Sequence, residues 1–178
     1  MNVFWLGDTP EACARGYDDT RVNKGAIEVA QCISAALLLR DRDPLSDLML
    51  DRGERNELYD PYNMDNALPH WAAMSRSHLW ALADVTRALS EEYVRRWDAD
   101  TEHGSWDAVK RWRRFFADVP DHGFSDPPFY GDDEYNTGDI IESYRAYYAY
   151  EKGADAEYVL GEVPEWWPDD APRPETTA

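Results

Sequence analysis

The spacing of apolar residues along the chain predicts a protein built mainly from helices. Between residues 19 and 40, apolar side chains recur every three or four positions and fall on one face: Val22, Ala26, Val29, Ile33 and Leu37. This spacing is typical of a helix with one buried face. Asp18 or Asp19 is a suitable N-terminal cap, because a carboxylate accepts hydrogen bonds from the free amides of the first turn. We therefore expect a long helix from residue 19 to about residue 40.

The same periodicity predicts further helices along the chain. A long one is expected over residues 69–97, a shorter one over 105–117, and a tyrosine-rich one over 140–151. The sequence Asp8-Thr9-Pro10-Glu11 is a typical helix start and predicts a short helix over 10–16. Residues 41–63 have no apolar periodicity, so we expect a loop or insertion with one helical turn in it.

These elements predict a mainly α protein, a single-domain helical bundle over residues 1–167. The strand signal is confined to Val3–Leu6, which we interpret as a short N-terminal strand or an extended lead. The 178 residues suffice for one domain with a sizeable core. Residues 168–178 are acidic and rich in proline, and we expect them to be disordered. The sequence shows neither a membrane span nor a signal peptide. We expect a cytoplasmic protein, from an archaeal or bacterial cell or from the host cell of a virus.

Charge adds a second constraint. The chain has 36 acidic and 18 basic residues, hence a net charge of −18, and its only lysines are Lys24, Lys110 and Lys152. Such an acidic surplus suggests a halophilic protein, since high salt screens the self-repulsion. The alternative is an acidic mimic of DNA or a binder of basic partners. Broad phosphate binding is disfavoured, but a local basic groove is not.

Metal and cofactor chemistry has little support in the sequence. Cys13 and Cys32 are too few for a disulfide framework or a zinc site, and we expect both to be small buried hydrophobes. His70 and His78 lie two helical turns apart, which is a weak metal signal without a third ligand. Histidines satisfied by local hydrogen bonds are the favoured interpretation. We expect no metal and no cofactor.

Four polar residues of the predicted 19–40 helix form one column on its surface: Arg21, Lys24, Glu28 and Gln31. Spacings of three and four residues place them on one helical face. On spacing alone, a solvated face with a Lys24–Glu28 pair is favoured, because charged columns are usually exposed. The alternative is a site. Lys24 would then be an amine nucleophile and Glu28 a general acid or base. Arg21 would hold a phosphate, and Gln31 would contact a base.

The order of motifs resembles a known family. Phe4 precedes the pattern Asp-x-x-Arg-Val-x-Lys-x-x-x-Glu-x-x-Gln over residues 18–31, and a tryptophan-bearing helix then runs from Trp71 to the acidic, tyrosine and arginine stretch 91–96. In this respect the chain resembles the pyrimidine dimer DNA glycosylase-like family, and its later segments, 119–124, 133–135, 142–152 and 164–167, resemble a phage or viral branch. The resemblance covers residues 1–167 apart from 41–63.

The resemblance implies cleavage of the N-glycosidic bond of a damaged or modified pyrimidine in DNA. Enzymes of that activity attack with the N-terminal amine and use a glutamate as the acid–base partner. Here Asn2 is large enough that we expect Met1 to be retained, which makes Lys24 the alternative amine and Glu28 its partner. The DNA-binding residues are then Arg21, Gln31, His70 and Arg145, of which Arg145 lies among tyrosines that stack bases or pack in the core with equal plausibility.

Two other functions remain open from the sequence. One is a viral enzyme that modifies nucleotides or DNA bases rather than excising them. The other is a non-enzymatic acidic viral protein that binds a host protein. The resemblance favours the DNA glycosylase, with DNA as partner and no membrane association.

The charge balance generates the first prediction. At neutral pH, raising chloride salt from about 0.05 M to about 1 M should raise the midpoint of thermal unfolding by several degrees, because screening weakens repulsion among the surplus carboxylates. Calorimetry measures this midpoint. Near the pI of about 4.4 the same salt step should have a much smaller effect, since the net charge vanishes there. A midpoint that falls with salt at neutral pH would contradict adaptation to high salt.

Overall fold

Seven α-helices carry the fold in residues 3–61 and 63–176, which are the residues that the computed structural model describes. The helices are α1 (Pro10–Gly16), α2 (Asp19–Arg42), α3 (Arg52–Glu57), α4 (Ala67–Met74), α5 (Arg76–Trp97), α6 (Gly104–Trp112) and α7 (Ile140–Tyr147). Short 3-10 turns follow α6 and precede α7, and a π-helical turn, Tyr148–Lys152, extends α7. Within the same residues, the only strands are β1 (Glu157–Tyr158) and β2 (Glu175–Thr176), which pair in parallel. The expected mainly α bundle is confirmed.

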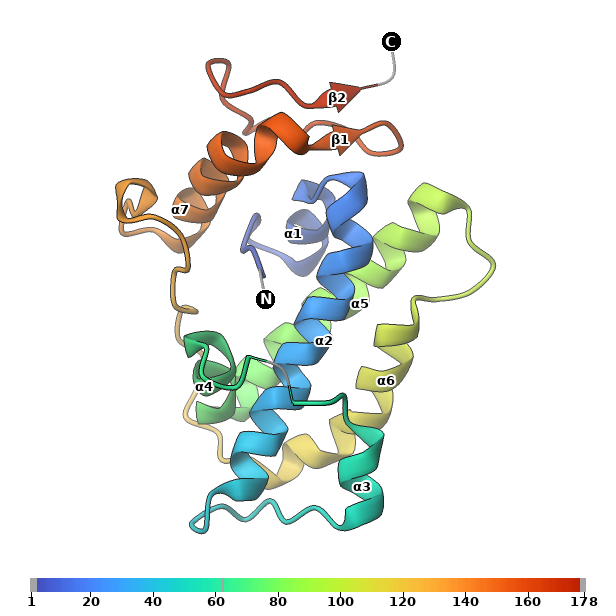
Figure 1. Ribbon diagram of the computed structural model, residues 1–178, viewed down its shortest axis with the longest axis vertical. Helices are drawn as coiled ribbons and strands as arrows, with labels where there is room; N and C mark the ends of the chain where they lie inside the picture. The colour runs from blue at the N-terminus through green and yellow to red at the C-terminus, as the bar shows by residue number, and fades with distance from the viewer. Residues whose placement is uncertain (1–2, 62, 177–178) are drawn as a thin grey trace.

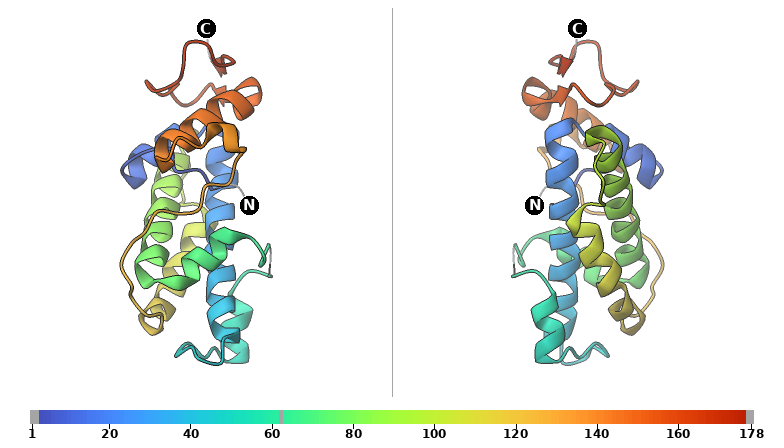
Figure 2. Two further views of the ribbon diagram at one scale, coloured as in Figure 1. Left: turned by 90° about the vertical axis from the view of Figure 1, so that its left-hand side faces the viewer. Right: turned by 90° about the vertical axis from the view of Figure 1, so that its right-hand side faces the viewer.

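Helix α2 is the central element (Figure 1). It runs lengthwise from beneath the layer of α7 and the strands to the opposite end of the molecule, and α5 crosses behind it in the opposite direction. Its contacts are most extensive with α5 and α4, and α6 packs against both α2 and α5. Figure 2 shows that α7 and the C-terminal segment form a separate layer across the end where α2 begins. The start of α2 is therefore the place where the N-terminal and C-terminal thirds of the chain meet.

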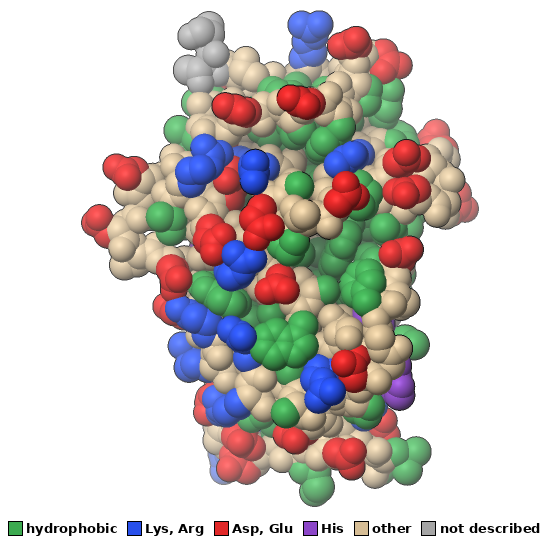
Figure 3. Space-filling model, turned by 180° about the vertical axis from the view of Figure 1, so that it is seen from behind, with side chains coloured by type: hydrophobic (Ala, Val, Ile, Leu, Met, Phe, Trp, Pro, Cys, Tyr) green, Lys and Arg blue, Asp and Glu red, His purple; other side chains and the backbone are tan. Residues whose placement is uncertain are grey.

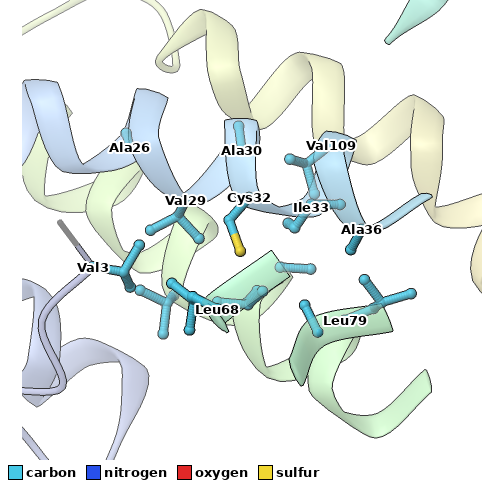
Figure 4. Packing of buried hydrophobic residues seen from close by; sticks show 14 of the residues in the cluster. Val3, Ala26, Val29, Ala30, Cys32, Ile33, Ala36, Leu68, Leu79 and Val109 are labelled. Carbon is cyan, nitrogen blue, oxygen red and sulfur yellow. The ribbon is translucent and has the colours of Figure 1, made fainter. Parts of the chain in front are cut away.

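The buried face of α2 is the one that the sequence predicts. Val22, Ala26, Val29, Ile33 and Leu37 are all fully buried. Figure 4 shows side chains of this helix meeting residues contributed by α4, α5 and α6. Among the described residues, α2 is also the one helix long and apolar enough to cross a membrane, contrary to the expectation that none would be. Its most apolar window is 67% buried inside the protein, as is usual for a core helix.

The helix expected over residues 69–97 is instead two helices, α4 and α5, separated at Ser75. This residue has an extended backbone with φ −147° and ψ 139°. Its hydroxyl donates to Asp121 Oδ1 at 3.1 Å and accepts from the amide of His122 at 3.0 Å. A serine side chain that bonds a distant loop in this way stabilises a break that local helix periodicity does not reveal. The break also lets the ring of His78 stack on Trp71, with centroids 4.1 Å apart.

Other expected segments are confirmed or corrected in detail. Asp41 and Arg42 belong to the end of α2, and residues 43–61 hold one short helix, α3, in an otherwise irregular segment, as expected. The run Val3–Leu6 is an extended lead that pairs with no strand, and the strands lie near the C-terminus instead. We expected disorder over 168–178, but residues 168–176 make defined contacts. The amide of Glu175 donates to the carbonyl of Ala156 at 2.9 Å, and β2 follows from this pairing. Thr177 and Ala178 lie outside the described residues.

Two buried aspartates at the start of α2 join the layers. Asp19 accepts hydrogen bonds from three consecutive amides, 159–161, at 2.8–3.1 Å, and from Arg96 Nη1 at 3.0 Å. Asp18 caps α2 and accepts a 2.6 Å hydrogen bond from the hydroxyl of Tyr148. Arg96, whose side chain is fully buried, also donates to Glu92 at 2.7 Å. We call Asp19, Arg96 and Glu92 the buried ion network. It ties α2, α5 and the C-terminal segment together.

The buried ion network generates the second prediction. Asp19→Asn should lower the free energy of unfolding by roughly 3–5 kcal/mol, because it leaves the buried guanidinium of Arg96 short of countercharge. Chemical denaturation measures the change. Glu91→Gln is the matched control, since Glu91 forms an exposed pair with Arg87 on the same helix as Arg96 and should change stability by about 1 kcal/mol or less. Equal effects of the two variants on the free energy of unfolding would show that the buried ion network stabilises the protein no more than an exposed pair does.

Candidate functional site

Three of the four column residues line one small hollow. Arg21, Lys24 and Glu28 share it with an aromatic floor, and its volume is about 230 Å³, part of it open to solvent. We call this hollow the lysine pocket; its residues are Phe4, Tyr17, Arg21, Lys24, Gly25 and Glu28. Gln31 is partly buried one turn further along α2 and is not among the lining residues.

The charges in the lysine pocket are balanced in pairs. Arg21 Nη1 lies 2.5 Å from Asp18 Oδ2, a carboxylate that is itself fully buried. Lys24 Nζ lies 3.7 Å from Glu28 Oε1. The Lys24 side chain is 64% exposed, whereas that of Glu28 is only 12% exposed. The column is thus neither a fully solvated face nor a closed site. An exposed ammonium faces solvent, and its carboxylate partner is largely buried near the floor.

The floor of the pocket is fixed by unusually close packing. The hydroxyl of Tyr17 accepts from the Phe4 amide at 2.7 Å and donates to the Phe4 carbonyl at 3.0 Å. The Tyr17 ring lies so close to α2 that a Cβ at Gly25 would approach its Cε1 to 2.8 Å. Burial raises the pKa of the Tyr17 hydroxyl well above its usual range, so this group stays protonated and supplies no base. Among the residues that line the pocket, Glu28 is accordingly the side chain that could act as a general base.

The other expected DNA-binding residues lie elsewhere. His70 is exposed on α4, and Arg145 is partly buried on α7; neither lines the lysine pocket. Arg145 lines a larger, open hollow together with Arg15 and Arg95. Met1 and Asn2, on which the expectation of a retained initiator methionine depends, lie outside the described residues.

The histidine and cysteine expectations can be compared with the structure directly. His78 Nδ1 lies 2.7 Å from the Trp71 carbonyl oxygen, and Nε2 accepts from the Ser125 amide at 3.1 Å, so this buried ring is satisfied locally. Cys13 and Cys32 are both buried free thiols, as predicted. Burial raises the pKa of Cys13 to about 11. Among the described residues, no group of three or more His, Cys, Asp or Glu side chains is arranged to hold a metal ion.

Sequence reasoning missed the parts of the site that lie outside the column. Tyr17 stands immediately before the expected cap, and nothing in its local sequence marks it as the residue that bonds Phe4. Asp18 was assigned only as a cap, although its carboxylate also neutralises Arg21. Gly25 was the one available signal, because a glycine inside a helix often marks a close approach of another group.

Comparison with known proteins adds no family to this description. No family model, no curated protein and no solved structure matches the chain.

The floor of the lysine pocket generates the third prediction. Gly25→Ala should destabilise the protein by about 1–2 kcal/mol, because the clash with Tyr17 outweighs the roughly 1 kcal/mol that alanine adds to helix stability. Gly104→Ala is the matched control: it also lies in a helix, and a Cβ there meets nothing within 4 Å. Denaturant unfolding compares the two variants. A stabilised Gly25→Ala protein would show that Tyr17 does not pack as tightly as described.

Proposed function

We propose that the protein is a DNA-directed enzyme that cleaves the N-glycosidic bond of a damaged or modified pyrimidine, with Lys24 as the nucleophile and Glu28 as its acid–base partner. The motif order of residues 18–31 supports this proposal through its resemblance to the glycosylase-like family. The main structural support is that the amine and a sheltered carboxylate are neighbours in one pocket, 3.7 Å apart. A lysine and a glutamate so placed are the groups that an amine-dependent glycosidic cleavage needs.

The proposed chemistry balances with these two groups. Glu28 takes a proton from the Lys24 ammonium, and the free Nζ lone pair attacks C1′ of the nucleotide. The bond from C1′ to the base breaks, and the pyrimidine leaves with the electron pair and receives the proton from Glu28. The sugar ring then opens, O4′ takes a second proton from the amine, and an iminium joins Nζ to C1′. Water releases the sugar by hydrolysis of this iminium.

The geometry of the pocket limits how DNA would bind. The hollow is too small and too open to enclose a nucleotide, so C1′ would have to approach Lys24 and Glu28 at its mouth, with the base out of the duplex before reaction. Arg21 is the cation best placed for a phosphate, but its charge is already neutralised by Asp18. Affinity for DNA therefore has to come from outside the pocket, against a net charge of −18. Binding should consequently be weak at low salt unless a separate basic surface contributes.

The fourth prediction tests the nucleophile. With ultraviolet-irradiated or pyrimidine-modified oligonucleotides, borohydride should reduce the iminium and give a covalent protein–DNA adduct, which peptide mass mapping should locate at Lys24. Lys24→Gln should abolish this adduct, and Glu28→Gln should slow its formation by about 10²–10⁴-fold. Lys110→Gln and Lys152→Gln are matched controls, since they change the other two lysines of the chain and should leave the adduct unchanged.

Three results would contradict the proposal. One is the absence of any adduct, and another is an adduct that forms normally in Lys24→Gln. The third is a change in the base, seen by mass spectrometry of nucleosides, without release of the base; this would assign a base-modifying enzyme instead. Stable capture of a host protein without any reaction on DNA would favour the non-enzymatic alternative.

A further inference from the structure

A second hollow lies between α1, α5, α7 and the segment 162–166. Its volume is about 1280 Å³ and it is widely open to solvent. Three arginines from three different helices line it: Arg15, Arg95 and Arg145. We call this hollow the arginine basin. Both views of Figure 2 place α1 on the side of the molecule that faces away from the viewer in Figure 1. Figure 3 shows this rear face, and basic and acidic side chains lie close together on its upper part.

Two of the three guanidinium groups are available to a ligand. In the described part of the chain, the Arg15 side chain is exposed and makes no hydrogen bond or ion pair. Arg145 makes no ion pair there either; its Nε donates to the Leu6 carbonyl at 3.0 Å, which leaves the two Nη groups unused. Arg95, by contrast, is held by two hydrogen bonds to Glu92. A guanidinium fixed through Nε alone is oriented in advance for a bidentate contact with an anion.

Arg145 is also held in place by an aromatic residue. Its guanidinium carbon lies 5.4 Å from the centre of the Trp166 ring. Trp167 stacks on the same indole at 5.8 Å with an interplanar angle of 23°. With these two neighbours stacked on it, Trp166 acts as a support for Arg145 rather than as a platform for a base. The basin therefore offers recognition of an anion without a dedicated stacking site.

The lining of the basin also contains two carboxylates. Glu162 and Glu165 are both exposed and line the basin together with the arginines. A simple inorganic anion gains nothing from these carboxylates. A ligand that carries hydroxyl groups beside its anionic group satisfies both kinds of side chain, because carboxylates accept hydrogen bonds from hydroxyls. The mixed lining selects such a ligand over a bare anion.

We propose that the arginine basin binds a phosphorylated sugar, with Arg15 and Arg145 on the phosphate and Glu162 and Glu165 on the sugar hydroxyls. The phosphorylated sugar belongs either to a small molecule or to the 3′-terminal nucleotide of a DNA strand, which carries a free 3′-hydroxyl beside its 5′-phosphate group. The proposal is independent of the chemistry assigned to Lys24, because the basin and the lysine pocket share no lining residue.

The fifth prediction measures binding to the full chain by calorimetry at about 0.15 M salt, where long-range repulsion is largely screened. The probes are ribose 5-phosphate and a single-stranded DNA oligonucleotide with a free 3′-hydroxyl. Arg15→Gln should weaken binding of the probe at least tenfold. Because the exposed Arg15 side chain makes no hydrogen bond or ion pair in the described structure, this variant should fold normally. Arg52→Gln is the matched control, since it removes an exposed arginine at the opposite end of the molecule and should leave binding unchanged (Figure 1).

Further variants separate the parts of the proposal. Arg145→Lys keeps the charge but removes the guanidinium fork, and it should also weaken binding. Glu165→Gln should weaken ribose 5-phosphate and leave inorganic phosphate unaffected. Lys24→Gln should bind both probes normally, so failure at the lysine pocket and failure at the basin are distinguishable.

Binding of the oligonucleotide alone or of the small probe alone identifies the source of the sugar phosphate. No binding of either probe, or equal binding by Arg15→Gln, overturns the proposal.

Discussion

The architecture depends on keeping Asp19 charged inside the protein. A buried carboxylate is costly unless its oxygens are fully hydrogen-bonded and its charge is compensated. Here three amides from residues 159–161 and the guanidinium of Arg96 meet that requirement. Because those donors come from two other parts of the chain, satisfying one side chain fixes where α5 and the C-terminal segment lie against α2. The layer formed by α7 and the strands thus depends on a polar contact as much as on apolar packing.

The same end of α2 positions both hollows. Asp18 neutralises Arg21 and bonds Tyr148, so the lysine pocket and the α7 layer share a support. Gly16 lines the arginine basin, whereas the next residue, Tyr17, lines the lysine pocket. Two sites of different character thus lie on either side of one short connection between α1 and α2. In the first, a lysine and an arginine are each paired with a carboxylate; in the second, Arg15 and Arg145 form no ion pair within the described residues.

The sequence predicted those features that depend on local periodicity. The inward face of α2 followed from five apolar residues at helical spacing, and the column was visible for the same reason. The break at Ser75 was not predictable, because it depends on a partner 46 residues away, Asp121. The burial of the Glu28 side chain and the separation of Arg145 from the column could not be predicted from the sequence for a similar reason. Spacing shows that residues share a helix face, but only the packing of α1, α7 and the N-terminal lead decides what covers that face.

The distance in sequence between Asp19 and its amide donors has a consequence for how the protein forms. These hydrogen bonds join residues 140 to 142 positions apart. The contacts among α1, α2, α4 and α5 need only the first hundred residues of the chain, whereas the carboxylate of Asp19 waits for residues 159–161. During synthesis, Asp19 in an emerging helical core can therefore pair with Arg96 and with water, but it meets its three amide donors only after residues 159–161 have left the ribosome. Docking of the C-terminal segment is consequently a late step, and a chain shortened before residue 159 would keep the Arg96–Asp19 pair but lack the three amide donors.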